Sequence, residues 1–294
     1  RLPQLTRLDL SGCIVDETTL KAVGRFEQLA RVDLRRTTLS PMAVAQWRAA
    51  HTECEVIYAV DPLLEALADE TRNKPVTLDT AVRQVAEVEV LKEGGVSVTV
   101  TDADLTDVGV ARLATYDGLT RLVLNGVSVT SAGLSRLELS RSLKVLDLSS
   151  TSITDHASTN LSRLVGLTEL SLADTEFSDR GLARLEGLEK LESLDLAGLA
   201  ITANGLTAAL PRFTALRHVN LAETWIVNAD LRVLETVKNL DSLSLRDTVI
   251  SDRGVPAILA LKSLKKLWIE RTRISEIGLE KLKKGLPGCE VFGP

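Results

Sequence analysis

The chain of 294 residues reads LKVLDLSSTSITD from Leu143 to Asp155, and this stretch sets the frame of a repeating unit. Units of about 24 residues that follow one another over most of a chain are typical of solenoids, in which each unit packs on its neighbours. The same frame starts at Leu5, Leu29, Leu119, Leu143, Leu167, Leu191, Leu216, Leu240 and Leu264.

The hydrophobic spacing changes within each unit. Leu170 and Leu172 alternate as the buried side chains of a short strand do, whereas Leu182, Leu185 and Leu188 recur at helical spacing. Each unit is therefore predicted to contain a strand, a turn, a helix and a return segment.

In most repeats a Thr or Ser marks the start of the predicted helix. A Thr or Ser hydroxyl there can accept from the free amides of the first turn, and a following acid suits the helix dipole. The capping positions are Ser40, Thr106, Thr130, Thr154, Ser178, Thr202, Ser251 and Ser275. Glycine stands three residues later in most units, which predicts a close approach between the helix and the neighbouring turn.

The segments from Thr151 to Asp155 and from Thr175 to Leu182 share a turn Thr and a capping Thr or Ser followed by Asp. This pattern resembles the cysteine-containing type of leucine-rich repeat, found in F-box-associated proteins and in many bacterial repeat proteins. The resemblance covers roughly four-fifths of the chain. It implies an α/β fold, a leucine-rich-repeat solenoid with parallel strands on the concave face and short helices on the convex face. Protein recognition is the usual role of such repeats.

The frame breaks after Val56 and resumes near Val96. Cys54-Glu-Val56 and Cys289-Glu-Val291 occupy the same phase, and the second lies near the end of the chain, so each is predicted to close an array. We therefore expect a first leucine-rich-repeat array over 1–60, a helical insert or linker over 61–95, and a second array with a C-terminal cap over 96–294.

The insert has two interpretations. A helix that begins after Asp79 and ends at Gly94-Gly95 is slightly favoured by the apolar spacing. The stretch from Val85 to Leu91 also alternates, so a hairpin through Lys92 to Gly95 is the alternative.

The first residues, from Arg1 to Leu5, enter the repeat in mid-frame. We expect the first array to be truncated at its N-terminus, and no F-box-like segment precedes it. Leu8 and Leu10 then lack a preceding layer, which predicts possible association through the exposed N-terminal repeat.

Composition excludes several classes of protein. A formal net charge of -5 and a pI near 5.4 give no basic surface for nucleic acid, and no apolar run reaches the length of a membrane span. Cys13, Cys54 and Cys289 are too few and too scattered for a disulfide framework, and Cys13 is expected to be a small buried residue at a turn.

No catalytic, cofactor or metal site is predicted. The histidines His51, His156 and His218 are isolated, and the chain holds no CxxC, HExxH or phosphate-loop motif. Acids on the strand side could in principle hold a cation, but other residue types interrupt their row. These acids are Asp9, Asp33, Asp147 and Asp195.

A binding patch is predicted on the strand side of the last three repeats. Trp268 would be its aromatic anchor and Trp225 its rim, in a mixture of aromatic, charged and polar groups typical of binding hot spots. In the alternative, Trp268 packs under the residues from Cys289 to Pro294. The patch comprises His218, Asn220, Trp225, Ser242, Ser244, Arg246, Lys266, Trp268 and Glu270.

These observations predict a non-enzymatic scaffold that binds another protein through the concave face. The alternative is a target-recognition subunit of a larger enzyme complex, similar to a ubiquitin-ligase receptor. An F-box-like or catalytic module upstream of Arg1 would favour that alternative. An enzyme in its own right is a third class, for which the sequence offers no motif.

Overall fold

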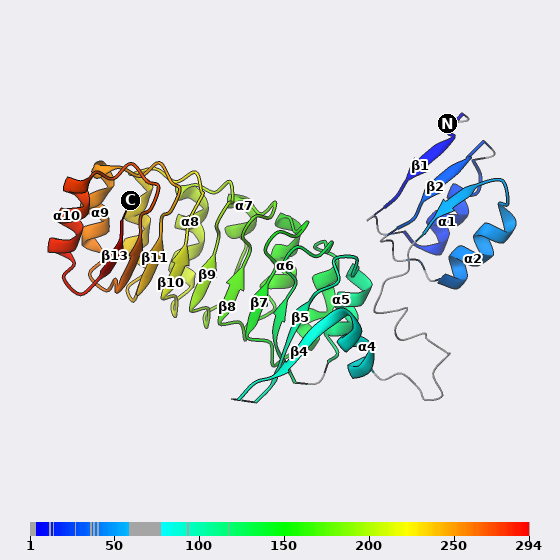
Figure 1. The fold of residues 1–294 in the computed structure, drawn as a ribbon, viewed down its shortest axis with the longest axis horizontal. Helices are drawn as coiled ribbons and strands as arrows, with labels where there is room; N and C mark the ends of the chain where they lie inside the picture. Colours follow the sequence, from blue (N-terminus) through cyan, green and yellow to red (C-terminus); the bar gives the residue numbers. More distant parts are fainter. Residues whose placement is uncertain are drawn as a thin grey trace.

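The computed structural model describes residues 4–58 and 78–293, apart from positions 12, 14, 27, 36, 38, 40, 93 and 117. The described strands form two sheets, one of three strands and one of ten (Figure 1). The strands of the first sheet are β1 (Arg7–Asp9), β2 (Arg31–Asp33) and β3 (Glu55–Ile57). The strands of the second are β4 (Ala86–Val90), β5 (Val96–Val100), β6 (Leu119–Val123), β7 (Val145–Asp147), β8 (Glu169–Ser171), β9 (Ser193–Asp195), β10 (His218–Asn220), β11 (Ser242–Ser244), β12 (Lys266–Trp268) and β13 (Glu290–Phe292).

The first sheet is parallel and keeps the register of the sequence repeat. Leu8 pairs with Val32, and Val32 pairs with Val56. Helices α1 (Glu17–Val23) and α2 (Pro41–Ala50) connect its strands, and Trp47 on α2 is buried in the core that they form with the sheet.

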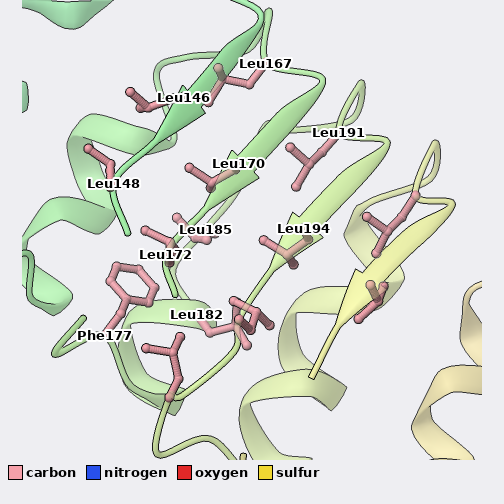
Figure 2. Packing of buried hydrophobic residues seen from close by; sticks show 14 of the residues in the cluster. Leu146, Leu148, Leu167, Leu170, Leu172, Phe177, Leu182, Leu185, Leu191 and Leu194 are labelled. Carbon is pink, nitrogen blue, oxygen red and sulfur yellow. The ribbon is translucent and has the colours of Figure 1, made fainter. Parts of the chain in front are cut away.

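The second sheet runs in sequence order from β4 to β13, and every pair from β5 onward is parallel. Figure 2 shows the frame leucines Leu146, Leu170 and Leu194 in equivalent positions on consecutive strands, and these three residues pair in register. The leucines of one repeat therefore pack on those of the next, which is how units too small to be stable alone build a common core.

Short helical segments line one face of the second sheet (Figure 1). Several are single turns or 3-10 turns, because the unit is too short to hold both a strand and a long helix. They are α5 (Asp107–Leu113), η1 (Gly133–Leu139), η2 (Asp155–Ala157), α6 (Ser158–Leu161), α7 (Asp179–Leu182), α8 (Ala203–Ala209), η3 (Leu210–Arg212), η4 (Asp230–Thr236), η5 (Asp252–Gly254), α9 (Val255–Ala260) and α10 (Glu276–Gly285).

The segment before the regular repeats differs from the favoured interpretation. Helix α4 (Leu78–Val85) ends ten residues earlier than Gly95, and β4 then pairs antiparallel with β5. Gly94 and Gly95 have φ of 84° and 94°, which suits the turn of this hairpin. The prediction of one helix up to Gly94-Gly95 is therefore wrong, and the alternation that begins near Val85 indicated the correct alternative.

The division into arrays at 1–60, 61–95 and 96–294 remains a proposal, because much of the 61–95 segment lies outside the described residues. Both Cys-Glu-Val segments do stand at the ends of described sheets: β3 is the last strand of the first sheet and β13 of the second. The second sheet, however, already begins at Ala86.

Where the turn position holds threonine, its hydroxyl closes the strand with a local hydrogen bond. Thr151 Oγ1 donates to the carbonyl of Leu148 at 2.6 Å, and Thr248 Oγ1 donates to that of Leu245 at 2.7 Å. Cys13 stands at this position in the first repeat and is exposed. The prediction that Cys13 is buried is wrong, because it follows β1, an edge strand with a described neighbour on one side only.

The helix starts confirm most predicted caps and add a bond between repeats. Thr106, Thr154, Ser178, Thr202 and Ser275 accept from amides of their own first turn, whereas Ser251 does not, and Ser40 lies outside the described residues.

The acid after the cap reaches the cap of the next repeat. Asp179 accepts from the Thr202 amide at 2.8 Å and from its hydroxyl at 2.6 Å. The equivalent pairs are Asp107 with Thr130, Asp155 with Ser178, and Asp252 with Ser275.

Asp179→Ala is expected to lower the free energy of unfolding by about 1 to 3 kcal/mol, because a part-buried amide and a hydroxyl lose their acceptor. The measurement is urea unfolding followed by circular dichroism.

Asp179→Asn is the matched control. Asn228 performs the same role in the wild-type chain, since its Oδ1 accepts from the Ser251 amide at 2.9 Å and its Nδ2 donates to the Ser251 hydroxyl at 3.1 Å. The asparagine variant should therefore lose less than the alanine variant. Equal losses would show that charge at Asp179 matters more than its two hydrogen bonds.

Candidate binding groove on the strand face

The face of the second sheet that carries no helices, here called the strand face, is hollowed over β9 to β12. The hollow, which we call the groove, has a volume of about 660 Å³. Its floor is low because Ser193, Ala197, Ala222, Ser242 and Ser244 are small. Larger side chains stand around them and form the walls.

Six of the nine predicted patch residues line the groove. They are His218, Asn220, Ser242, Ser244, Arg246 and Trp268. Their outward direction follows from the strand frame, because the buried residues Val219, Leu243 and Leu267 alternate with them. His218 Nδ1 and the Ser242 hydroxyl lie 2.7 Å apart, so β10 and β11 are also joined across the floor.

Trp268 is half-buried, and both interpretations of this residue hold in part. Its indole stacks on Phe292 of β13, with ring centroids 5.2 Å apart and planes inclined by 8°. It also lines the groove. The last strand thus supports the indole without removing it from the strand face.

Three predicted residues do not line the groove. Trp225 is exposed on the turn that follows β10, and Lys266 is exposed on β12. Glu270 lies beside the groove, where its Oε2 is 3.5 Å from Arg246 Nε. The carboxylate of Glu270 is thus an ionic neighbour of Arg246, although no hydrogen bond to Glu270 Oε2 is found in the described part of the chain.

Other charged residues that line the groove were missed as patch members. They are Asp195, Glu223, Asp247 and Arg271. Arg271 donates through Nε and Nη2 to Asp247 at 2.5 and 2.6 Å, and this pairing holds the pKa of Asp247 below its usual range. Glu223, Asp247 and Arg271 share one phase of the repeat, two residues after the last buried aliphatic residue of the strand frame. That phase in the sequence could have revealed them.

Asp195 lies on the groove floor, and the acid row to which it belongs has a structural role. Its Oδ1 accepts from the Ala197 amide at 3.0 Å, and Asn220 accepts from the Ala222 amide at 3.1 Å in the next repeat. This local bond shapes the turn after each strand. The same bond is made by Asp9, Asp33 and Asp147.

The electrostatics around Asp195 are unfavourable for its charge. Burial is the main cause that raises the pKa of Asp195, and the nearby charges of Asp147 and Asp174 raise it further. Among the described residues no group of three or more His, Cys, Asp or Glu side chains could hold a metal ion.

Comparison with known proteins matches this architecture. A family model described as Leucine Rich repeat matches residues 139–156, which include the stretch that sets the frame. The crystal structure of internalin C2 from Listeria monocytogenes resembles this chain with a TM-score of 0.52 at 20% identity, over 80% of this chain and 92% of that one. The chain has the leucine-rich-repeat fold.

A second leucine-rich-repeat structure is similar over a shorter part of its own length. It is the ectodomain of the membrane receptor kinase GASSHO1/SCHENGEN3 from Arabidopsis thaliana, in complex with CASPARIAN STRIP INTEGRITY FACTOR 2. The TM-score is 0.43 at 16% identity, over 79% of this chain and 29% of that one. No curated protein shows a significant sequence match. Within the described part of the leucine-rich-repeat chain, no helix combines the length and apolar character needed to cross a membrane.

The repeat position that Glu223, Asp247 and Arg271 share has a left-handed backbone. Glu223, Asp247 and Arg271 have φ of 58°, 55° and 55°, whereas Gly126 and Gly198 occupy the same phase in other repeats with φ of 70° and 71°. A left-handed backbone is unfavourable for residues with a Cβ. Ser150 and Asp174 have the same left-handed backbone in repeats that do not line the groove, so this strain belongs to the turn of the repeat and does not mark the groove by itself.

Glu223→Gly is accordingly expected to raise the free energy of unfolding by up to about 1 kcal/mol, since relief of the left-handed strain exceeds the added freedom of the unfolded chain. The reverse change, Gly126→Ala, should lower stability by about 1 to 2 kcal/mol. Gly126 is suitable for this control because an added Cβ would meet no atom within 4 Å. Urea unfolding of both variants measures the difference. A loss of stability in Glu223→Gly would mean that the carboxylate stabilises the fold.

Proposed function

We propose that this leucine-rich-repeat protein is a non-enzymatic scaffold that binds another protein through the strand face, with the groove over β9 to β12 as its contact site. The observation that supports this most directly is the position of the groove. It lies over the last repeats, where outward side chains alternate with buried aliphatic residues, and it combines a supported indole with hydroxyls and carboxylates. Such mixtures at a hollow are typical of binding hot spots.

We also propose that the repeats belong to the cysteine-containing subclass of the leucine-rich repeat. Its support is the turn position, where threonine hydroxyls close the strands and where Cys13 stands in the first repeat.

The test fills the groove without touching the core. Ser244 lies on the groove floor in the same strand phase as Trp268, so Ser244→Trp places an indole where the repeat already accepts one. A protein partner is first captured with the wild-type chain from the source organism and identified by mass spectrometry. Its dissociation constant is then measured with purified components, and Ser244→Trp should weaken it at least about tenfold.

Ser171→Trp is the matched control. Ser171 occupies the same phase on β8 but does not line the groove. Unchanged affinity in Ser171→Trp together with loss in Ser244→Trp supports the groove. Full affinity in Ser244→Trp would place the contact on another surface.

A further inference from the structure

We propose that the bound partner presents an extended segment with two features: a basic side chain that enters the groove beside Asp195 and Glu223, and an apolar side chain that packs on Trp225, Val227 and Val249. This inference rests on the proposed function and specifies the chemistry of the partner. It follows from which charges in the groove are already paired and from an apolar surface at its edge.

The cations that line the groove are already engaged. Arg271 is paired with Asp247 through two short hydrogen bonds, and Arg246 lies 3.5 Å from the Glu270 carboxylate. Both guanidiniums therefore have an acid as their neighbour. In and beside the groove the acids Asp195, Glu223, Asp247 and Glu270 outnumber Arg246 and Arg271, so the excess charge there is negative.

The acids are in the opposite situation. Asp195 and Glu223 line the groove, and neither makes an ion pair within the described part of the chain. Asp195 accepts from the Ala197 amide and has a side-chain hydrogen bond with Asn220, so its hydrogen-bond partners are neutral groups. Burial is the main cause that raises the pKa of Asp195, and the nearby negative charges of Asp147 and Asp174 raise it further. Charge complementarity therefore selects a Lys or Arg side chain of the partner.

The apolar surface lies beside the groove, on the turns that follow β10 and β11. Trp225, Val227 and Val249 have exposed fractions of 70%, 44% and 43%, and they are among few large apolar side chains so exposed in the described residues. We call these three residues the edge patch. Exposed apolar groups that gather in one place, rather than singly, mark interaction sites.

The phase of the bridges between repeats indicates that two members of the edge patch, Val227 and Val249, are neighbours. Along this edge Thr154 pairs with Glu176, and Ser251 pairs with Arg273. The same offset places Val227 opposite Val249. Asn228 is also bonded to Ser251, which holds the two turns together next to the two valines.

The edge patch is continuous with the groove. Glu223 and Asp247 line the groove, and Trp225 and Val249 follow each of them by two residues on the same turns. A segment that leaves the groove over these turns therefore meets the edge patch immediately. In the neighbouring repeats this phase carries Ser152, Glu176, Ala200 or Arg273, so two consecutive large apolar residues in this phase occur only at Trp225 and Val249 in the sequence.

The test uses short synthetic peptides with a Gly-Ser background, one Lys or Arg and one Leu at varied separations. Matched peptides carry Glu in place of the basic residue or Ser in place of Leu. Binding to the full chain is measured by fluorescence anisotropy at low and high salt. The peptides with both features should bind at least about tenfold more tightly than the Glu peptides, and this advantage should shrink at high salt.

Variants assign each feature to its surface. Asp195→Asn combined with Glu223→Gln should remove the preference for Lys or Arg over Glu. Trp225→Ser should remove only the preference for Leu over Ser. Glu235→Gln, an exposed acid on η4 outside the groove lining, is the control for loss of charge and should change neither preference.

Equal binding of Lys and Glu peptides, preference for Glu peptides, or no detectable binding of any peptide overturns this inference. These outcomes are separable from failure of the proposed function. If Ser244→Trp still abolishes binding of the captured protein, the groove remains the contact site and only the basic segment is excluded. If Ser244→Trp has no effect on either ligand, both proposals fall.

Discussion

Replacing Phe177 by alanine is expected to lower the free energy of unfolding by about 3 to 5 kcal/mol. The ring is only 1% exposed and is the largest of the fully buried side chains in the described residues. Figure 2 shows it beneath the strand leucines of its repeat, near Leu182. Strands on both sides hold the surrounding backbone in register, so the cavity left by the ring cannot collapse freely. Urea unfolding monitored by circular dichroism gives the difference.

Phe177→Ile is the matched control. Other repeats carry isoleucine in this phase, at Ile153, Ile201, Ile226, Ile250 and Ile274, and all are buried. The frame therefore accepts isoleucine, and the loss should stay below about 1.5 kcal/mol. If the alanine variant loses no more stability than the isoleucine variant, neighbouring residues can move in to fill the cavity. The backbone around Phe177 would then be less rigid than its strand pairing suggests.

The strands were predictable because their signal is local. Leu170 and Leu172 bury alternate positions of one strand, and that alternation is visible within a single repeat. The hairpin of β4 and β5 was harder, because the segment from Val85 to Leu91 is compatible with both periods. Only pairing with β5, which sequence periodicity does not report, decides between them.

The role of the helix-start acids could be predicted only in part. Asp179 does stand in a helical first turn, where the helix dipole favours an acid. Its hydrogen bonds, however, reach Thr202 in the next repeat. A partner in another unit cannot be identified from the pattern of one unit, because the relevant distance depends on how the units stack.

The strand phase predicted which side chains of the last repeats point outward, but it did not predict the electrostatics of the groove. Alternation is enough to show that His218, Asn220 and Ser244 point outward. It does not show that Arg246 and Arg271 are already paired with acids, nor that Asp195 is left without a cation. Those pairings depend on side-chain conformations across neighbouring turns. The direction of these side chains could thus be predicted from sequence, whereas the patch as a binding site stays a proposal and the charge of its partner could be proposed only from the structure.

Gly205→Ala is expected to lower the free energy of unfolding by about 2 to 4 kcal/mol. Helix propensity alone predicts the opposite sign, since Gly205 lies in α8 and alanine is better in a helix by about 1 kcal/mol. The close approach predicted from the glycine phase reverses that gain. A Cβ would lie 2.5 Å from Asp179 Oδ1 and 2.8 Å from its Cα, and the backbone atom cannot move without shifting the preceding repeat.

The two controls for Gly205→Ala separate packing from the loss of glycine itself. Gly288→Ala should change stability by less than about 0.5 kcal/mol, because an added Cβ there meets nothing within 4 Å. The double variant with Asp179→Ala should lose less than the sum of the single changes, since the new methyl group and the carboxylate no longer collide. Urea unfolding of the four chains completes the cycle. If Gly205→Ala instead stabilises the protein, the repeats can slide apart, and the Asp179 to Thr202 bonds do not fix their spacing.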